Sequence, residues 1–172
     1  MDNKNYTAME IANYIVDYAN EVLRVKNLTP IKLQKILYYV YVNCLVKQNT
    51  KLFNQPIEKW KFGPVVSSVY HNFKIYGVGH INNTISDYEF SENPNEIFSF
   101  KEIPFDSTQL HFSANVSQEI HSTISELIDL DPFKLVEQTH TEAPWKLKEP
   151  EILKGVRGLV YSDQEILEHL GK

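Results

Sequence analysis

The stretch IKLQKILYYVYVNCLV, residues 31–46, decides the fold of this chain because apolar side chains surround most of it after its first turn. Pro30 stands just before it, at a position that suits the first turn of a helix. At helical spacing the apolar residues form two stripes, Leu33, Ile36, Leu37, Val40, Tyr41, Cys44 and Leu45 in one and Tyr38, Tyr39, Val42 and Val46 in the other. A helix that is apolar on nearly all sides is buried inside a bundle. We therefore predict a central buried helix at about residues 30–47, with Lys32 and Lys35 at its exposed start.

Local signals also mark the segments on either side of this helix. Thr7 and Glu10 have the spacing of a capping box, which predicts the start of an earlier helix. Residues 56–62 alternate between two faces, as a short strand does. Gly63 is expected to end that strand, and Pro64 suits the first position of another helix. The sequence thus predicts a strand-turn-helix corner whose aromatic residues anchor it to the central helix.

The segment from residue 80 to 105 changes from helical to strand periodicity. It is rich in β-branched and aromatic residues and contains turn-forming residues at 92–95. We predict two or three short antiparallel strands within 80–105, pairing with the strand at 56–62.

Helical periodicity returns in the last third of the chain. Ser113 caps one predicted helix, Asp131 starts a short helix that runs through His140, and Ser162 starts the last one. Residues 146–161 are interpreted as a loop. The predicted fold class is mainly α (α+β), a helical bundle around the central helix with a small antiparallel β-sheet. No linker or repeat divides the chain, so we expect one domain over all 172 residues.

Composition excludes several classes of function. The formal net charge is -5 and the pI is about 5.7, which argues against a protein that grips nucleic-acid backbones directly. No apolar run approaches the roughly 20 residues that span a membrane. The single Cys44 cannot form an internal disulfide, and no secretion leader precedes Thr7. We expect a cytoplasmic protein, not bound to membranes, whose partner is another protein or a small ligand.

Motifs for catalysis, metal binding or cofactor binding are not found in the sequence. Cys44 lies on an apolar helical stripe, where a free cysteine usually acts as a small hydrophobic residue. His71 and His80 lack the spacing of zinc ligands, and no nucleophile elbow or phosphate loop occurs. The pairs Glu119/Glu126 and Glu149/Glu151 are interpreted as solvated surface charges, and nothing in the sequence places a carboxylate inside. We predict no catalytic residue, no metal and no cofactor, and keep a metal-dependent or cysteine enzyme as an alternative.

The heptapeptide THTEAPW, residues 139–145, admits two interpretations. In the first, it is a helix end at which His140 bonds the last carbonyls and Trp145 fills the core. In the second, His140, Glu142 and Trp145 lie beside Trp60 and Pro64 at one recognition edge, since aromatic residues next to His or Arg are typical of binding anchors. The sequence does not decide between them.

The chain contains three ordered motifs, LTPIKLQKILYYVY (28–41), KWKFGPVVSSVYHNFKIYG (59–77) and THTEAPW (139–145). Together they resemble the SocA-like antitoxin domain, also called the Panacea domain, of bacteria, prophages and mobile elements. The positions that match the family motifs are Leu33, Gln34, Lys35, Leu37 and Tyr38, then Trp60, Gly63, Pro64, Val65 and Tyr70, then His140, Pro144 and Trp145. Ser67 and Ser68 stand where the family often has a proline, which leaves the partner open.

The resemblance implies a mainly helical, non-enzymatic antitoxin domain that neutralises a toxin by direct binding. One member of the family acts as an adaptor that delivers its toxin to the Clp protease, so a Clp-type protease is a second expected partner. Among the carried-over residues we expect Lys35 and His140 to contact the partner. The residues expected to shape and fill the corner are Gly63, Pro64, Trp60 and Trp145.

A second binding function remains open beside the antitoxin. A phage or mobile-element protein of this kind would inhibit a host defence nuclease, again by occupying its surface.

Overall fold

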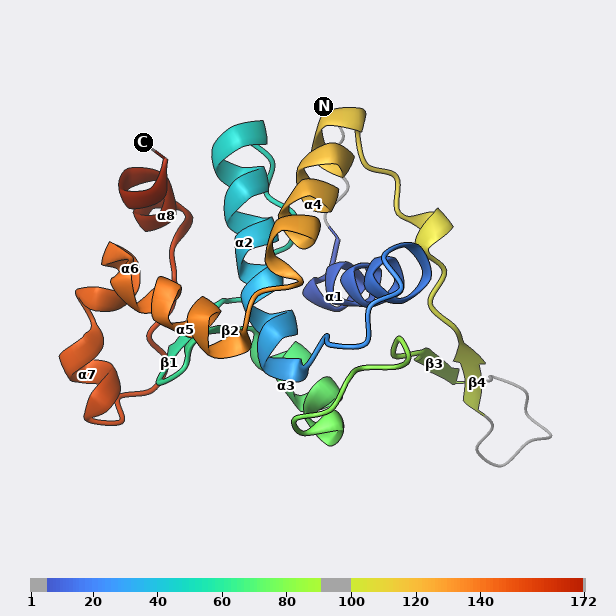
Figure 1. The fold of residues 1–172 in the computed structure, drawn as a ribbon, viewed down its shortest axis with the longest axis horizontal. Helices are drawn as coiled ribbons and strands as arrows, with labels where there is room; N and C mark the ends of the chain where they lie inside the picture. The colour runs from blue at the N-terminus through green and yellow to red at the C-terminus, as the bar shows by residue number, and fades with distance from the viewer. Residues whose placement is uncertain (1–5, 91–99, 172) are drawn as a thin grey trace.

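The computed structural model describes residues 6–90 and 100–171, and its central element is helix α2 (Pro30–Gln48), which runs through the middle of the molecule (Figure 1). The Thr29 hydroxyl caps the helix by accepting a hydrogen bond from the Lys32 amide. Most side chains of α2 are buried, on every side of the helix. The predicted central buried helix is confirmed.

Helices from both halves of the chain surround α2. In Figure 1, α1 (Ala8–Asp17) and α4 (Ala114–Leu127) lie on one side of it, and α5 (Pro132–Thr141) and α8 (Asp163–Leu170) lie on the other. A shorter helix, α3 (Ser67–Phe73), packs near the start of α2. One hydrophobic core therefore extends around the central helix.

Local caps start these helices where the sequence predicts them. At α1, the Thr7 hydroxyl accepts from the Glu10 amide and the Glu10 carboxylate accepts from the Thr7 amide, a complete capping box. The side chains that cap α4, α5 and α8 are those of Ser113, Asp131 and Ser162. After α1 the chain continues as a π-helical turn, Tyr18–Val22.

A tight hairpin follows α2. Strand β1 (Glu58–Trp60) pairs antiparallel with β2 (Gly63–Val65), so the chain reverses at Lys61 and Phe62. Gly63 has a φ of +88°, a conformation that glycine adopts at low cost, and this allows the reversal.

The hairpin corrects two sequence predictions. Residues 56–62 are not one strand that ends in a helix, because the strand stops at Trp60 and a second strand returns beside it. Pro64 is not the first residue of a helix: it lies in β2 opposite Lys59, and α3 is capped by Val66. A local preference of proline for helix starts is outweighed here by pairing between the two strands.

The outer edge of β1 is covered by a segment from the end of the chain. The Lys59 amide donates to the Leu159 carbonyl over 2.7 Å, and the Tyr161 amide donates to the Ile57 carbonyl over 2.8 Å. This pairing leaves β1 no free edge for the strands of the next segment.

A second hairpin, β3 (Asp87–Phe90) and β4 (Phe100–Ile103), projects from the body of the molecule (Figure 1). The predicted strands within 80–105 are thus present. Their predicted pairing with 56–62 is wrong, because in the described part of the chain the two hairpins form separate sheets. The turn predicted at 92–95 lies outside the described residues.

The segment after α5 is more helical than predicted. Pro144 lies in the first turn of a short helix, α6 (Ala143–Lys146), and α7 (Glu149–Leu153) interrupts the predicted loop at 146–161. Short 3₁₀ turns at Lys74–Tyr76 and Ser107–Gln109 complete the described elements. The fold class is as predicted, mainly helical with a small β component. Among the described helices, none is long and apolar enough to cross a membrane.

Gly63 provides a test of how closely the hairpin packs on the bundle. We expect Gly63→Ala to lower the free energy of unfolding by about 2 to 4 kcal/mol, because the residue has a positive φ and the new Cβ would lie 2.5 Å from Thr139 Oγ1 and 3.0 Å from Lys35 Cε. Gly155 is the matched control, with a φ of +82° and no atom within 4 Å of a new Cβ, so Gly155→Ala should cost only about 1 kcal/mol. Urea unfolding measures both, and equal losses would contradict the packing.

Candidate functional site

The turn of the first hairpin presents Trp60, Lys61 and Phe62 at the surface, and we call these three residues the hairpin edge. Trp60 is half-buried, while Lys61 and Phe62 are exposed. The Trp60 indole donates to Glu58 Oε2 over 2.7 Å, and its ring meets the Tyr70 ring edge-to-face with centroids 5.2 Å apart. Trp60 is therefore held in one orientation. It is only half-buried, whereas the sequence analysis predicted that it fills the corner.

Beneath this edge, Lys35 joins the central helix to β2. Its Nζ donates to the Pro64 carbonyl over 3.0 Å, and the side chain is only 1% exposed. Burial lowers the pKa of the Lys35 amine to about 7. The Gln34 amide makes a second link, since its Oε1 accepts from the Val66 amide over 2.9 Å. Four consecutive residues of β2 and its continuation, 63–66, are thus buried against α2.

The prediction that Lys32 and Lys35 are exposed is wrong. Lys32 is also buried, and its Nζ donates to the Ile128 carbonyl over 2.7 Å. Lysines are usually exposed, and both exceptions are accommodated because a main-chain carbonyl from a distant segment accepts the amine.

The segment 139–145 closes the other side of the hairpin. Trp145 is 2% exposed, and its indole donates to the Trp60 carbonyl over 3.0 Å. The His140 ring stacks on the Trp145 ring with centroids 3.7 Å apart. Burial, together with the charge of Lys35, lowers the pKa of His140. Trp145 fills the core, as the first interpretation predicts, and it also brings His140 next to the hairpin, whereas a recognition edge at this place stays a prediction.

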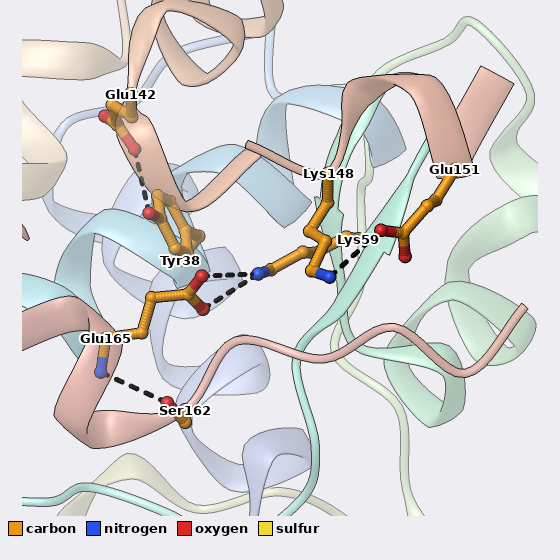
Figure 2. A network of polar contacts seen from close by, with 7 residues as sticks. All are labelled: Tyr38, Lys59, Glu142, Lys148, Glu151, Ser162 and Glu165. Atoms are coloured by element: carbon orange, nitrogen blue, oxygen red, sulfur yellow. Dashed lines mark hydrogen bonds and ion pairs between the residues drawn. The ribbon is translucent and has the colours of Figure 1, made fainter. Parts of the chain in front are cut away.

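Glu142 faces a different set of partners, the tyrosines of α2. The Tyr38 and Tyr39 hydroxyls donate to its two carboxylate oxygens over 2.8 and 2.6 Å, and Figure 2 shows the Tyr38 bond. Burial raises the pKa of Glu142 above its usual range, against the opposing effect of the two hydrogen bonds. The sequence analysis placed no carboxylate inside, and Glu142 is the correction to it.

An ion pair that the sequence analysis missed lies beside this network. Lys59 Nζ contacts both oxygens of Glu165, at 2.7 and 2.8 Å (Figure 2). The same Nζ lies 5.0 Å from the centroid of the Tyr161 ring. Tyr161 in turn packs on Tyr38 with ring centroids 5.0 Å apart. The signal in the sequence was the alternation of residues 56–62, which places Lys59 on the same face as the buried Ile57.

The predicted site residues therefore form two groups joined by the segment 139–145. The group at the hairpin consists of Lys35, Trp60, Gly63, Pro64, Tyr70, His140 and Trp145. The group at the tyrosine network consists of Tyr38 and Glu142, with Tyr39 and Tyr161 as additional members. The two groups differ in chemistry, because the first is cationic and aromatic and the second holds a buried acid.

Two cavities flank Trp60. One, of about 330 Å³, is lined by residues that include Lys35, Lys61, Tyr70 and Lys74, and we call it the hairpin pocket. The other, of about 540 Å³, lies between β1 and the segment around Arg157. Within residues 6–90 and 100–171, no group of three or more His, Cys, Asp or Glu side chains could hold a metal ion.

These features define a mainly helical domain whose central helix, hairpin and 139–145 segment are held together by buried polar contacts. The sequence model of the family "Antitoxin SocA-like, Panacea domain" matches residues 33–146, which include most of α2 and all of the hairpin and of the segment 139–145. The chain belongs to this family.

A curated relative supports the same assignment. Antitoxin SocA of Caulobacter vibrioides (strain NA1000 / CB15N) is 36% identical over 83 residues, which is 48% of this chain and 43% of that protein. The match therefore spans less than half of the relative's length. No solved structure matches the chain significantly.

The two tryptophans should differ in their effect on stability. We expect Trp145→Ala to lower the free energy of unfolding by about 3 to 5 kcal/mol, because it empties a buried site and removes the hydrogen bond to the Trp60 carbonyl. Trp60→Ala should cost roughly 1 to 2 kcal/mol, since that side chain is only half-buried. Denaturant unfolding of both variants gives the comparison, and a larger loss for Trp60 would show that the burial is misassigned.

Glu142 should make stability depend on pH in a defined direction. Because its pKa is raised, the folded protein holds the carboxyl proton to a higher pH than the unfolded chain, in which the group titrates near 4.5. Unfolding then releases a proton, so the free energy of unfolding falls as pH rises from 4.5 through the folded pKa.

The variant Glu142→Gln keeps the shape of the side chain but cannot titrate. We expect its stability relative to the wild type to increase steadily across that pH range, as measured by urea unfolding at several pH values. The difference between the two proteins removes the contributions of other groups, such as His140. A difference that stays constant with pH would show that Glu142 titrates normally.

Proposed function

We propose that this chain is an antitoxin that neutralises a protein toxin by binding it directly, without any chemical step of its own. Membership of the SocA-like antitoxin family is the observation that carries the proposal. The similarity to Antitoxin SocA supports it over about half of the chain. A toxin that acts inside the cell would place the antitoxin in the cytoplasm with it.

The surface around the hairpin edge is suited to this role. Phe62 is 52% exposed, and the nearby Ile75 and Val78 are 85% and 96% exposed. Exposed apolar side chains that gather beside aromatic rings are a usual mark of an interaction surface. The buried contacts of Lys35 and Trp145 hold the main chain of the hairpin at Pro64 and Trp60, which limits the backbone entropy lost on binding.

The energy required is within the reach of such a surface. Nanomolar neutralisation corresponds to about 12 kcal/mol of binding free energy, and an interface of about 1,600 Å² with a few aromatic anchors can supply it. Occlusion of the toxin by a surface of this size requires no active site.

Direct occlusion and delivery to a Clp-type protease predict different fates for the toxin. Occlusion leaves the amount of toxin unchanged, whereas delivery lowers it in cells that contain the protease. We propose occlusion as the basic mode, with delivery as an added step where the protease is present. Immunoblots of the toxin in cells with and without the protease distinguish the two.

Neutralisation can be tested with a toxin encoded by a gene next to this one. We expect co-expression to restore growth and the two proteins to copurify. Phe62→Glu should lower the affinity by at least about 10-fold, because it places a charge within an apolar interface. Tyr88→Glu is the matched control, an exposed aromatic residue on the projecting hairpin, and should have no effect.

Failure of the wild-type protein to bind any toxin encoded nearby would contradict the antitoxin function. Stoichiometric inhibition of a host defence nuclease, without a neighbouring toxin, would favour the alternative function. Equal loss of binding in Phe62→Glu and Tyr88→Glu would keep the function but move the interface away from the hairpin edge.

A further inference from the structure

The hairpin pocket has a charge composition opposite to that of the chain. The chain has 22 acidic and 17 basic residues. The lining of this pocket includes three lysines, Lys35, Lys61 and Lys74, and no carboxylate. A concave site with one sign of charge on an otherwise acidic protein attracts groups of the opposite sign.

These three lysines have no acidic partner among the residues that the structure describes. Lys35 Nζ donates to a main-chain carbonyl, that of Pro64. Lys61 Nζ lies 5.7 Å from the centroid of the Phe62 ring, and Lys74 Nζ lies 3.4 Å from His71 Nδ1. Lysines elsewhere do form ion pairs, namely Lys47, Lys51, Lys59, Lys146 and Lys148. The positive charge at the pocket is therefore left uncompensated within the described chain.

The walls of the hairpin pocket are aromatic. Trp60 and Tyr70 meet edge-to-face, and Phe62 adds a third ring that is half-exposed. Lys74 and Gly77 also line the pocket, and each is followed in the chain by an exposed apolar residue, Ile75 and Val78 respectively. The site thus combines an apolar surface with positive charge, a combination that recognises an apolar side chain next to a carboxylate.

We propose that the hairpin pocket binds an acidic segment of the protein partner, with carboxylates facing Lys35, Lys61 and Lys74 and an apolar side chain against Trp60 and Tyr70. This inference rests on the proposed function, because the partner is the protein that the antitoxin neutralises. It specifies which chemistry of the partner is recognised and where.

Burial of Lys35 strengthens the argument. A buried ammonium group without a counterion is costly, which is why burial lowers the pKa of Lys35 to about 7. A carboxylate brought into the pocket would favour the charged amine. Binding of the carboxylate and protonation of Lys35 would then favour each other.

A protein segment fits this site better than a nucleic acid does. Nucleic-acid binding uses a basic stripe that follows many phosphates, and the domain is then usually basic overall. Here the chain carries a net charge of -5, and the three cations line one cavity of about 330 Å³.

The test uses the whole protein and three labelled probes in fluorescence anisotropy. The first is a short peptide, blocked at both ends, in which aspartate and phenylalanine alternate. The second has asparagine in place of aspartate, and the third is a DNA duplex. We expect the acidic peptide to bind at least about 10-fold more tightly than the amide peptide, with the difference shrinking in high salt.

Variants then locate the interaction. Lys35→Met keeps the length and the apolar stem of the side chain but removes the charge, and should abolish the preference for the acidic peptide. The double variant Lys61→Met/Lys74→Met changes only exposed positions and should reduce the same preference, which keeps the test decisive if Lys35→Met does not fold. Lys134→Met, on the exposed face of α5, is the control and should leave it unchanged.

Equal affinity for the two peptides, no peptide binding, or a preference that survives in both lysine variants would overturn the proposal. Tighter binding of the DNA duplex would also overturn it, in favour of a phosphate site. Toxin neutralisation separates this inference from the proposed function. If the wild type and both lysine variants neutralise the toxin equally well, only the pocket assignment fails, whereas a wild type that neutralises nothing refutes the function itself.

Discussion

The central constraint in this protein is that α2 is buried on nearly every side although it carries many polar side chains. A buried donor or acceptor without a partner costs about 1 to 3 kcal/mol, so each of these side chains has to find its partner in another element. The contacts that satisfy them run from Lys32 to Ile128, from Gln34 to Val66, from Lys35 to Pro64, from Tyr38 and Tyr39 to Glu142, and from Tyr41 to Asp163. Because the partners lie on different segments, the hydrogen bonds that the polar side chains of α2 require fix the positions of the hairpin, the end of α4, the end of α5 and the start of α8.

These polar contacts determine geometry more than they add stability. A hydrogen bond inside a protein contributes only about 1 kcal/mol net, because it replaces a bond to water, and the apolar surface of the core contributes most of the stability. A shift or rotation of α2 would leave the buried Gln34 amide or Lys35 amine unpaired, and this cost adds to the loss of apolar packing. The same reasoning explains why Gly63 lies where it does: a Cβ at that position would collide with Thr139 and with the Lys35 side chain.

The parts of the fold that the sequence predicts correctly depend on neighbours in the sequence. The caps at Thr7 and Thr29 act over three residues, and the burial of α2 follows from the periodicity of its own apolar side chains. The errors concern interactions over long separations. Lys35 was expected at the surface because lysine usually lies there, and its acceptor, Pro64, is 29 residues away. The burial of Glu142 was missed because its two tyrosine partners are more than 100 residues away, so that nothing near it in the sequence indicates burial. The motifs indicated where the candidate site lies. Its cationic pocket could not be predicted from them, because the lysines that line it come from α2, the hairpin and the end of α3, which are close together only in the folded chain.

This division between buried and exposed residues bears on how such a domain could recognise different partners. Most of the motif residues at the hairpin, among them Lys35, Gly63, Pro64 and Trp145, are buried and occupied with internal contacts. The residues between them that reach solvent, Lys61, Phe62 and Lys74, have no role in those contacts. Substitutions at the exposed positions can therefore alter the charge and shape of the pocket mouth without disturbing the framework beneath it, whereas a change at Lys35 or Gly63 would affect both. Under the proposed function, the motif supplies a rigid support of constant shape, and the exposed residues within it determine which acidic surface is bound.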